Sequence, residues 1–274
     1  MTERREPLER IADALERLAP PVTTPIDWLG APAYVWSGTT VAAIGSLETV
    51  PLATLRGIDR QKKAVCTNFE RLATGAAAHD MLLWGSRGMG KSALIRAASV
   101  WQGEEHPGAL ALVQVASDGL GSIAGLIDTL AKQDRAYLLF LDDLGFAQGK
   151  PHENLALRSL LDGTVVARPP NVRLAVTSNR RAIVQRGHEE DAARHERDER
   201  DDALALADRF GLTLGFHPCD QATYLEIVRA YTDPLALLFD EEEALAWAVA
   251  RGNRSGRIAY QFANEVAGRA GKAL

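Results

Sequence analysis

The stretch that most constrains this chain is Leu82-Leu83-Trp84-Gly85-Ser86-Arg87-Gly88-Met89-Gly90-Lys91-Ser92-Ala93-Leu94. An apolar run precedes a glycine loop, and the loop precedes a segment with helical periodicity, so a strand, a loop and a helix are predicted. The spacing Gly85-x-x-x-x-Gly90-Lys91-Ser92 is that of a phosphate-binding loop (P-loop). The loop also lies where such a loop must lie, between a strand and a helix.

The residue types in this loop have a physical reason. Glycines let backbone N–H groups turn toward phosphate oxygens, and the helix that follows adds positive potential at its N-terminus. Lys91 is expected to reach the β- and γ-phosphates, and the Ser92 hydroxyl to bind Mg²⁺. The predicted phosphate-binding residues are Gly85, Ser86, Arg87, Gly88, Met89, Gly90, Lys91, Ser92 and Ala93.

A second element is acidic. Leu138-Leu139-Phe140-Leu141-Asp142-Asp143 reads as an apolar strand that ends in two carboxylates. Asp142 would hold Mg²⁺, and Asp143 would orient or deprotonate an attacking water. The alternative is a pair of solvated acids at a strand end. A P-loop together with this pair predicts Mg-ATP chemistry.

The next predicted strand ends in Thr177-Ser178-Asn179. Asn179 can hydrogen-bond both a γ-phosphate and the attacking water, which would make it a nucleotide sensor. The alternative is ordinary turn chemistry after a strand, which Ser and Asn also favour.

Two arginine features bear on the class of protein. Arg209 precedes the last strand and, in an oligomer, would face the nucleotide of the next subunit, whereas a plain surface pair with Asp208 is the alternative. Arg257 opens the final helix and would reach the phosphates, with Arg254 as the less favoured candidate. Two solvated arginines in a helix-entry turn are the alternative.

The order of elements predicts an α/β fold. Apolar strands alternate with helices, which indicates a mainly parallel sheet flanked by helices, and after Pro218 only helical patterns follow. The charged run 188–202 is typical of a solvated loop or helix face, with a partner-docking insertion as the minority reading. Three parts are expected: 1–49, an N-terminal helix and Pro/Gly-rich arm; 50–217, an α/β nucleotide-binding domain containing the insertion 188–202; and 218–274, a helical lid.

Composition excludes several classes. With 274 residues and a net charge of −5, the chain has no general attraction to nucleic acid or anionic membranes, although a small basic cluster, Arg180, Arg181 and Arg186, keeps nucleic-acid loading open. Cys66 and Cys219 lie far apart without metal-type spacing, so no disulfide framework or zinc site is expected. No apolar run could span a bilayer and no signal segment is evident, so a cytoplasmic protein is predicted.

Together these motifs resemble the AAA+ ATPase module. In that resemblance Gly85–Ser92 is Walker A, Asp142 and Asp143 are Walker B, Asn179 is sensor 1, Arg209 is the arginine finger and Arg257 is sensor 2. It also implies that Arg56-Gly57-Ile58 lies against the adenine. More narrowly, the stretches Gly57–Lys62, Leu82–Gly85, Thr177–Arg181, Asp208–Leu212 and Arg254–Arg257 resemble a bacterial AAA+ group, domain-of-unknown-function family 815.

The resemblance implies a Mg-dependent ATPase that converts ATP to ADP and phosphate, in a homo-oligomer that couples nucleotide state to remodelling of the oligomer or of a protein partner. Asp143 departs from the Glu usual in AAA+ proteins, so a slow nucleotide-dependent switch or loader is the alternative. A P-loop kinase for a small molecule is less favoured, because the helical segment follows the sheet instead of interrupting it. Asp118–Ser122 lacks an aromatic residue, which disfavours a threading unfoldase.

Overall fold

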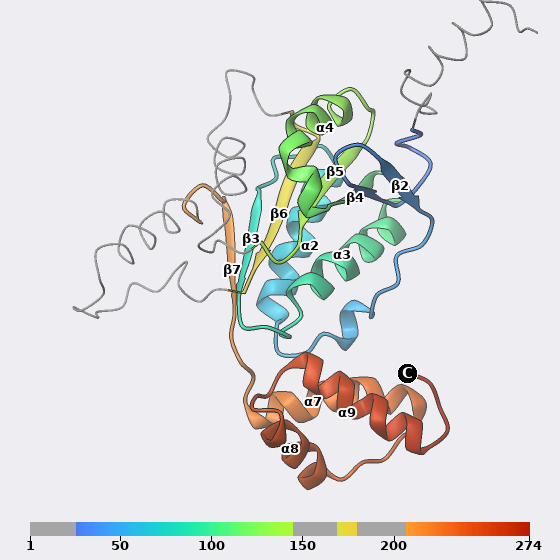
Figure 1. Cartoon of the computed structure of the whole chain (residues 1–274), viewed down its shortest axis with the longest axis vertical. Helices are drawn as coiled ribbons and strands as arrows, with labels where there is room; N and C mark the ends of the chain where they lie inside the picture. Colours follow the sequence, from blue (N-terminus) through green and yellow to red (C-terminus); the bar gives the residue numbers. More distant parts are fainter. Residues whose placement is uncertain (1–25, 145–168, 180–206) are drawn as a thin grey trace, which may run out of the picture.

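The computed structural model describes residues 26–144, 169–179 and 207–274 (Figure 1). Several sequence predictions fall elsewhere and lie outside the described residues. They are the N-terminal helix, the charged insertion 188–202 and the basic cluster of Arg180, Arg181 and Arg186.

A seven-stranded sheet forms the centre of the molecule, in the order β2-β1-β4-β5-β6-β3-β7. The pairs β1–β4, β4–β5, β5–β6, β6–β3 and β3–β7 are parallel, and β1–β2 is antiparallel. This confirms the predicted mainly parallel α/β fold. The strands are β1 (Ala33–Trp36), β2 (Val41–Ile44), β3 (Met81–Gly85), β4 (Leu110–Val115), β5 (Ala136–Leu141), β6 (Val172–Ser178) and β7 (Leu212–Phe216).

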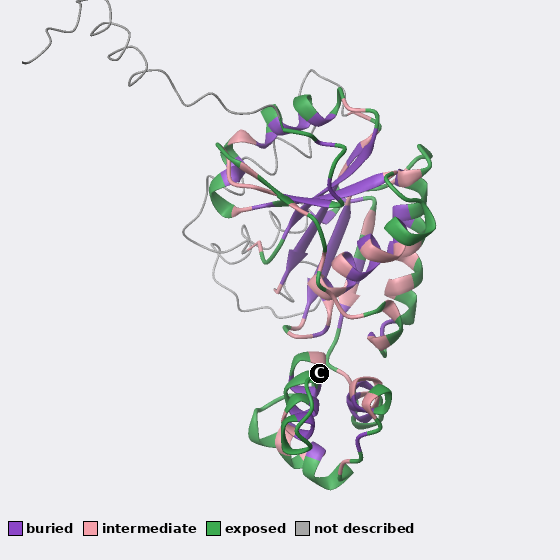
Figure 2. Ribbon diagram, turned by 90° about the vertical axis from the view of Figure 1, so that its right-hand side faces the viewer, coloured by how far each residue is buried: buried purple, intermediate pink, exposed green. Residues whose placement is uncertain are grey.

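Helices cover both faces of the sheet, which is why β3 and β5 are buried along their whole length (Figure 2). On β3, Met81 and Leu83 face the cluster that contains α2 (Asp59–Ala73) and α3 (Lys91–Glu105). Leu82 and Trp84 face the opposite cluster, which contains α4 (Ile123–Leu130). The P-loop therefore leaves a strand that is packed on both sides.

Residues 33–44 differ from the sequence prediction. The sequence predicts an arm there, whereas the structure shows two strands that extend the sheet, with β1 parallel to β4. Each strand has only four residues, and β2 has a mixed burial pattern, so neither gives a strong alternating signal. Trp28, in the segment that leads into β1, is 5% exposed and belongs to the core.

A buried arginine anchors the chain that leads into β1. The Arg135 guanidinium donates hydrogen bonds to the carbonyl oxygens of Trp28, Ala31 and Leu110, the one to Ala31 at 2.7 Å. The Tyr137 hydroxyl donates to the Trp28 carbonyl as well, at 3.0 Å. These bonds satisfy backbone groups that lie in the interior, where an unpaired carbonyl would be costly.

Three helices after the sheet form a separate cluster below it in Figure 1: α7 (Gln221–Thr232), α8 (Glu241–Ala250) and α9 (Gly256–Arg269). We call these helices the lid. Their own core centres on Tyr224 and Phe262, both 0% exposed. Asp220, Asp240 and Ser255 cap the helix N-termini through their side chains. Within the described ranges, no helix combines the length and hydropathy needed to cross a membrane.

Candidate phosphate-binding site

The P-loop begins at the C-terminal end of β3 and requires its glycines. Gly85 has φ 120°, and a Cβ there would lie 2.1 Å from the Phe216 carbonyl oxygen on β7. The same carbonyl accepts a hydrogen bond from the Ser86 N–H, at 2.9 Å. Gly88 and Gly90 also have positive φ, 75° and 87°. Because L side chains rarely adopt this conformation, the loop depends on glycine at these points.

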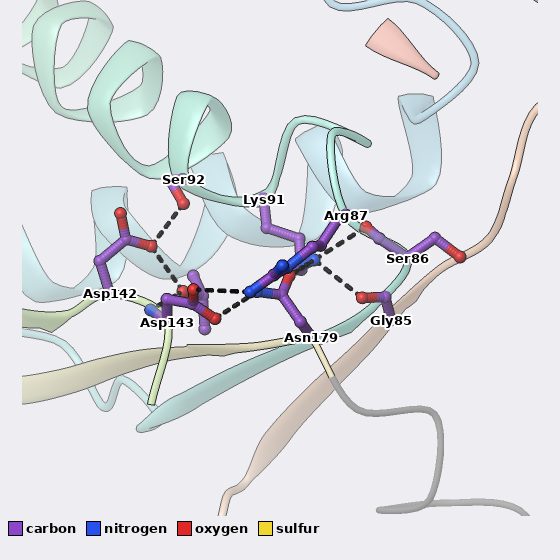
Figure 3. Close-up of polar contacts among 9 residues, drawn as sticks. Gly85, Ser86, Arg87, Lys91, Ser92, Asp142, Asp143 and Asn179 are labelled. Atoms are coloured by element: carbon purple, nitrogen blue, oxygen red, sulfur yellow. Dashed lines mark hydrogen bonds and ion pairs between the residues drawn. The ribbon is translucent and has the colours of Figure 1, made fainter. Parts of the chain in front are cut away.

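Lys91 is the buried cation of the loop, with 6% of its surface exposed (Figure 3). Its Nζ donates to the carbonyl oxygens of Gly85 and Ser86, both at 2.9 Å, and to Asn179 Oδ1 at 3.0 Å. Burial lowers the pKa of Lys91 to about 8, against the opposing pull of Asp143 and Asp142. Lys91 is thus held beneath the loop and still carries its charge near neutral pH.

Asp142 lies opposite the start of α3 and is fixed by hydroxyl groups. Its Oδ1 accepts hydrogen bonds from Ser92 Oγ and from Thr177 Oγ1, the latter at 2.6 Å. Mg²⁺ prefers oxygen ligands and usually takes only one or two from the protein, with substrate phosphates and water supplying the rest. Ser92 and Asp142 fit that pattern, and the described residues contain no cluster of three or more His, Cys, Asp or Glu side chains.

Asp143 has an unusual backbone, with φ 54°. Asp tolerates this left-handed conformation better than most side chains do. Its Oδ1 accepts a hydrogen bond from Asn179 Nδ2, and its Oδ2 lies 3.6 Å from a guanidinium nitrogen of Arg87. Both carboxylate oxygens of Asp143 are therefore engaged (Figure 3).

Thr177 is a residue that the sequence reasoning missed as part of the site. Its side chain is 1% exposed at the end of β6. The hydroxyl donates to Asp142 Oδ1 and accepts a hydrogen bond from the Asp143 N–H, at 2.8 Å. The signal in the sequence was a hydroxyl residue at the end of an apolar strand, two residues before the predicted sensor Asn179.

The segment before α2 borders the loop. Ile58 is 4% exposed, and a Cβ on Gly90 would lie 3.6 Å from Ile58 Cδ1. Gly57, with φ 72°, packs so closely on the lid that a Cβ there would lie 2.3 Å from Thr223 Cγ2. Ile58 thus lies where the P-loop, the sheet domain and the lid meet.

The first turn of α9 touches the loop directly. The Arg257 N–H donates to the Gly88 carbonyl oxygen at 3.0 Å, and the Arg257 charge contributes to the lowered pKa of Lys91. Arg254 is instead close enough to Asp220 to affect its ionisation. Hydrogen bonds from Thr223 lower the pKa of Asp220, and the charge of Arg254 lowers it further. Of the two candidate arginines, Arg257 is therefore the one beside the P-loop.

Arg209 lies far from this group. It is exposed and stands in the turn before β7, whose first residue, Leu212, pairs with Met81 at the start of β3. The P-loop follows the other end of β3. Five residues of strand at about 3.3 Å each separate the two ends by roughly 17 Å. The structure brings Lys91, Ser92, Asp142, Asp143 and Asn179 together and leaves Arg209 at the opposite, N-terminal ends of β3 and β7.

Comparison with solved structures places this fold. The Thermotoga maritima RuvB Holliday junction branch migration motor is 18% identical, with a TM-score of 0.50 over 79% of this chain. The Aeropyrum pernix ORC1 protein, solved in complex with DNA, is 15% identical, with a TM-score of 0.56 over 80% of this chain. This chain covers 64% and 63% of those two structures. The FIGL-1 AAA domain, solved with ADP, is 16% identical, with a TM-score of 0.53, and the match covers 81% of this chain and 75% of that one.

No curated protein matches the chain at a significant level. A family model does match residues 30–270, which is most of the chain, and its description reads "Protein of unknown function (DUF815)". The fold, with its P-loop after β3 and its helical lid, is that of the AAA+ P-loop ATPases. The chain therefore belongs to the DUF815 family and has an AAA+ fold.

Proposed function

We propose that the protein binds and hydrolyses ATP with Mg²⁺ in a site completed by a neighbouring subunit. The observation that carries the proposal is the convergence of a P-loop lysine, a magnesium-type hydroxyl–carboxylate pair and a second carboxylate. Lys91, Ser92, Asp142, Asp143 and Asn179 form one hydrogen-bonded group with Thr177. Each of these side chains is of the type that phosphoryl transfer requires.

The roles follow from the geometry. Glycine-loop N–H groups and Lys91 would hold the phosphates, and Ile58 would lie against the base. Ser92 and Asp142 would hold Mg²⁺, which neutralises charge on the β- and γ-phosphate oxygens. A water attacks the γ-phosphorus, Asp143 takes its proton, and the bond to the β-phosphate oxygen breaks to give ADP and phosphate. Asn179, which already bonds Lys91 and Asp143, would orient that water.

The position of Arg209 supports the proposal that several copies of this chain assemble into an oligomer. The strand length of β3 separates Arg209 from the P-loop of its own subunit, so any contact of Arg209 with a nucleotide would be at the site of another subunit. An arginine supplied in this way is worth about 10³–10⁵ in rate for phosphoryl transfer. We propose that subunits assemble so that Arg209 faces the neighbour's γ-phosphate.

One feature weighs against threading of a polypeptide through a central channel of the assembly. The loop 118–122 after β4 is packed against the N-terminal strands. Trp36 Nε1 donates to Ser122 Oγ at 3.1 Å, and a Cβ on Gly119 would lie 2.7 Å from Trp36 Cδ1. A loop fixed in this way is poorly suited to gripping a moving chain. We favour remodelling of the oligomer or of a docked partner.

A slower switch is the second candidate, and Asp143 is the observation that favours it. Asp143 is shorter than Glu, and both of its oxygens are engaged. A displacement of about 1 Å can cost roughly 100-fold in rate. Single-turnover measurements separate the two: bound ATP that survives for hours supports the switch, and repeated turnover supports the ATPase.

The assembly is tested by measuring mass in solution with no nucleotide, with ADP and with ATP, alongside phosphate release per subunit over a range of protein concentration. We expect ATP to favour the larger species and release per subunit to rise with concentration. Arg209→Ala should remove that rise. Release that stays flat with concentration, together with full activity of Arg209→Ala, would contradict the shared site.

A further inference from the structure

Arg87 is a cation within the P-loop, and its side chain is turned toward the C-terminal ends of β5 and β6. Figure 3 shows it extending from the loop toward Asp143 and Asn179. Its guanidinium lies 3.6 Å from Asp143 Oδ2, and its charge contributes to the lowered pKa of Lys91. The side chain is 74% exposed, so it is free to change partner.

The charges around the loop favour an additional anion. Lys91, Arg87 and Arg257 bring three positive charges near the loop, and Asp142 and Asp143 bring two negative ones. The ion pair between Arg87 and Asp143 is long and exposed, which makes it weak. Arginine binds phosphate with two parallel hydrogen bonds, and such charge-assisted contacts are stronger than a single exposed pair.

We propose that, when ATP is bound, Arg87 releases Asp143 and binds the γ-phosphate of that ATP in the same subunit. ATP then draws Arg87 away from Asp143 Oδ2, which leaves that oxygen free to accept the proton of the attacking water. ADP lacks the γ-phosphate, so Arg87 stays on Asp143. This inference rests on the proposed binding of Mg-ATP at the P-loop.

Two other arginines considered for the phosphates are placed differently. Arg209 lies by the N-terminal ends of β3 and β7, away from the P-loop. Arg257 belongs to the lid, and its backbone is bonded to Gly88. Arg87 alone among the three combines a place in the loop with a contact to Asp143, so it links the presence of the γ-phosphate to the state of the base.

The first test is calorimetric titration of the full chain with Mg-ADP and with a non-hydrolysable ATP analogue. The variants are Arg87→Gln and the matched control Arg71→Gln, an exposed arginine in the last turn of α2. We expect Arg87→Gln to weaken analogue binding roughly tenfold, the size of one charge-assisted contact, with a much smaller effect on ADP. Arg71→Gln should match the wild type for both ligands.

A second comparison uses Asp143→Asn. Removal of the carboxylate frees Arg87, so this variant should bind the analogue more tightly than the wild type, and the gain should vanish when Arg87→Gln is added. A gain that persists in the double variant contradicts the exchange, because it then arises from the lost Asp143 charge alone.

The remaining outcomes are separable. Equal weakening of ADP and analogue binding by Arg87→Gln would overturn the proposal, because Arg87 would then only add charge to the loop. Unchanged analogue affinity with faster hydrolysis would overturn it too, because Arg87 would then only restrain Asp143. If the wild type binds both ligands no better than Lys91→Ala does, the proposed function fails, and the inference fails with it.

Discussion

The backbone N–H of Arg257 donates a hydrogen bond of 3.0 Å to the carbonyl oxygen of Gly88. Arg257 lies in the first turn of α9, the last helix of the lid, and Gly88 lies in the middle of the P-loop. Any movement of the loop around a phosphate must therefore move or break a contact with the lid. This bond therefore couples the position of the P-loop to that of the lid.

Gly88→Ala should weaken that contact. A Cβ at Gly88 would lie 2.9 Å from Ser255 Oγ and 3.0 Å from Arg257 Cβ, so the lid would have to shift. Gly75 is the matched control: its φ is 74° against 75° at Gly88, but a Cβ there meets nothing within 4 Å. Both substitutions should cost about 1 kcal/mol or more for the left-handed backbone.

We expect Gly88→Ala to lower the free energy of unfolding further than Gly75→Ala and to weaken nucleotide binding, as measured by urea denaturation and calorimetry. Hydrogen exchange of the Arg257 amide should accelerate in Gly88→Ala alone. Equal stability and equal exchange in the two variants would show that the contact between loop and lid is unimportant.

Lys91 should make nucleotide binding depend on pH. Its pKa is lowered from 10.5 to about 8 by burial, so the free protein loses this charge as the pH rises through that value. Affinity for ADP should then fall by at most about tenfold per pH unit, because one proton is involved. Lys91→Arg, whose charge does not titrate in this range, should bind more weakly but with a flat profile. The same slope in Lys91→Arg would assign the effect to another group.

The same lowered pKa of Lys91 makes the stability of the fold increase with pH, whereas it makes nucleotide binding weaken. Between pH 8 and 10.5 the unfolded chain still holds the Lys91 proton and the folded chain has lost it, so the destabilising contribution of Lys91 shrinks as the pH rises. The free energy of unfolding of the wild type should therefore rise relative to that of Lys91→Met as the pH increases from about 8 to 10.5. A difference that is constant with pH would contradict the lowered pKa.

Thr177 is expected to act as a positioning residue. Thr177→Val removes the hydroxyl that joins Asp142 to the Asp143 backbone, whereas Thr177→Ser keeps it. Thr177→Val should lower the hydrolysis rate by roughly 100-fold, the cost of a misplaced reacting group, and should raise the Mg²⁺ concentration needed for half-maximal rate. Binding of ADP without Mg²⁺ should change little. Loss of activity in Thr177→Ser to the same degree would indicate packing rather than hydrogen bonding as the cause.

Two inactive variants should restore activity when mixed. Lys91→Ala keeps Arg209 but cannot hold phosphate, and Arg209→Ala keeps its P-loop but lacks the arginine. In a shared assembly, an intact P-loop of one variant would meet an intact Arg209 of the other. Phosphate release by the mixture should exceed the sum of the two separate rates. A simple sum would show that each site works within one subunit.

The sequence was sufficient for most of the sheet and lid, because their periodicity is strong. The strand predicted to end at Leu141 and the exclusively helical region predicted after Pro218 agree with the structure. The strands β1 and β2 escaped prediction, since each is short and β1 gains its place from pairing with β4, far along the chain. Such long-range pairing leaves little trace in the local pattern.

The site was predictable where it depends on local motifs and not where it depends on distant contacts. Lys91 and Asp142 follow from their loop and strand. The positive φ of Asp143, the bridge made by Thr177 and the bond from Arg257 to Gly88 require the packed structure. The role of Arg87 was equally hidden, because spacing places its backbone in the loop but not its guanidinium beside Asp143.

The most direct test of ATP hydrolysis at this site is phosphate release from Mg-ATP by the wild type and by Asp143→Asn, at protein concentrations that saturate assembly. Asn is nearly the same size and also tolerates the left-handed backbone, so the fold and ATP binding should survive. We predict repeated turnover by the wild type and none by Asp143→Asn, with ATP still bound. Equal phosphate release by the two proteins, or none by the wild type, would contradict this account.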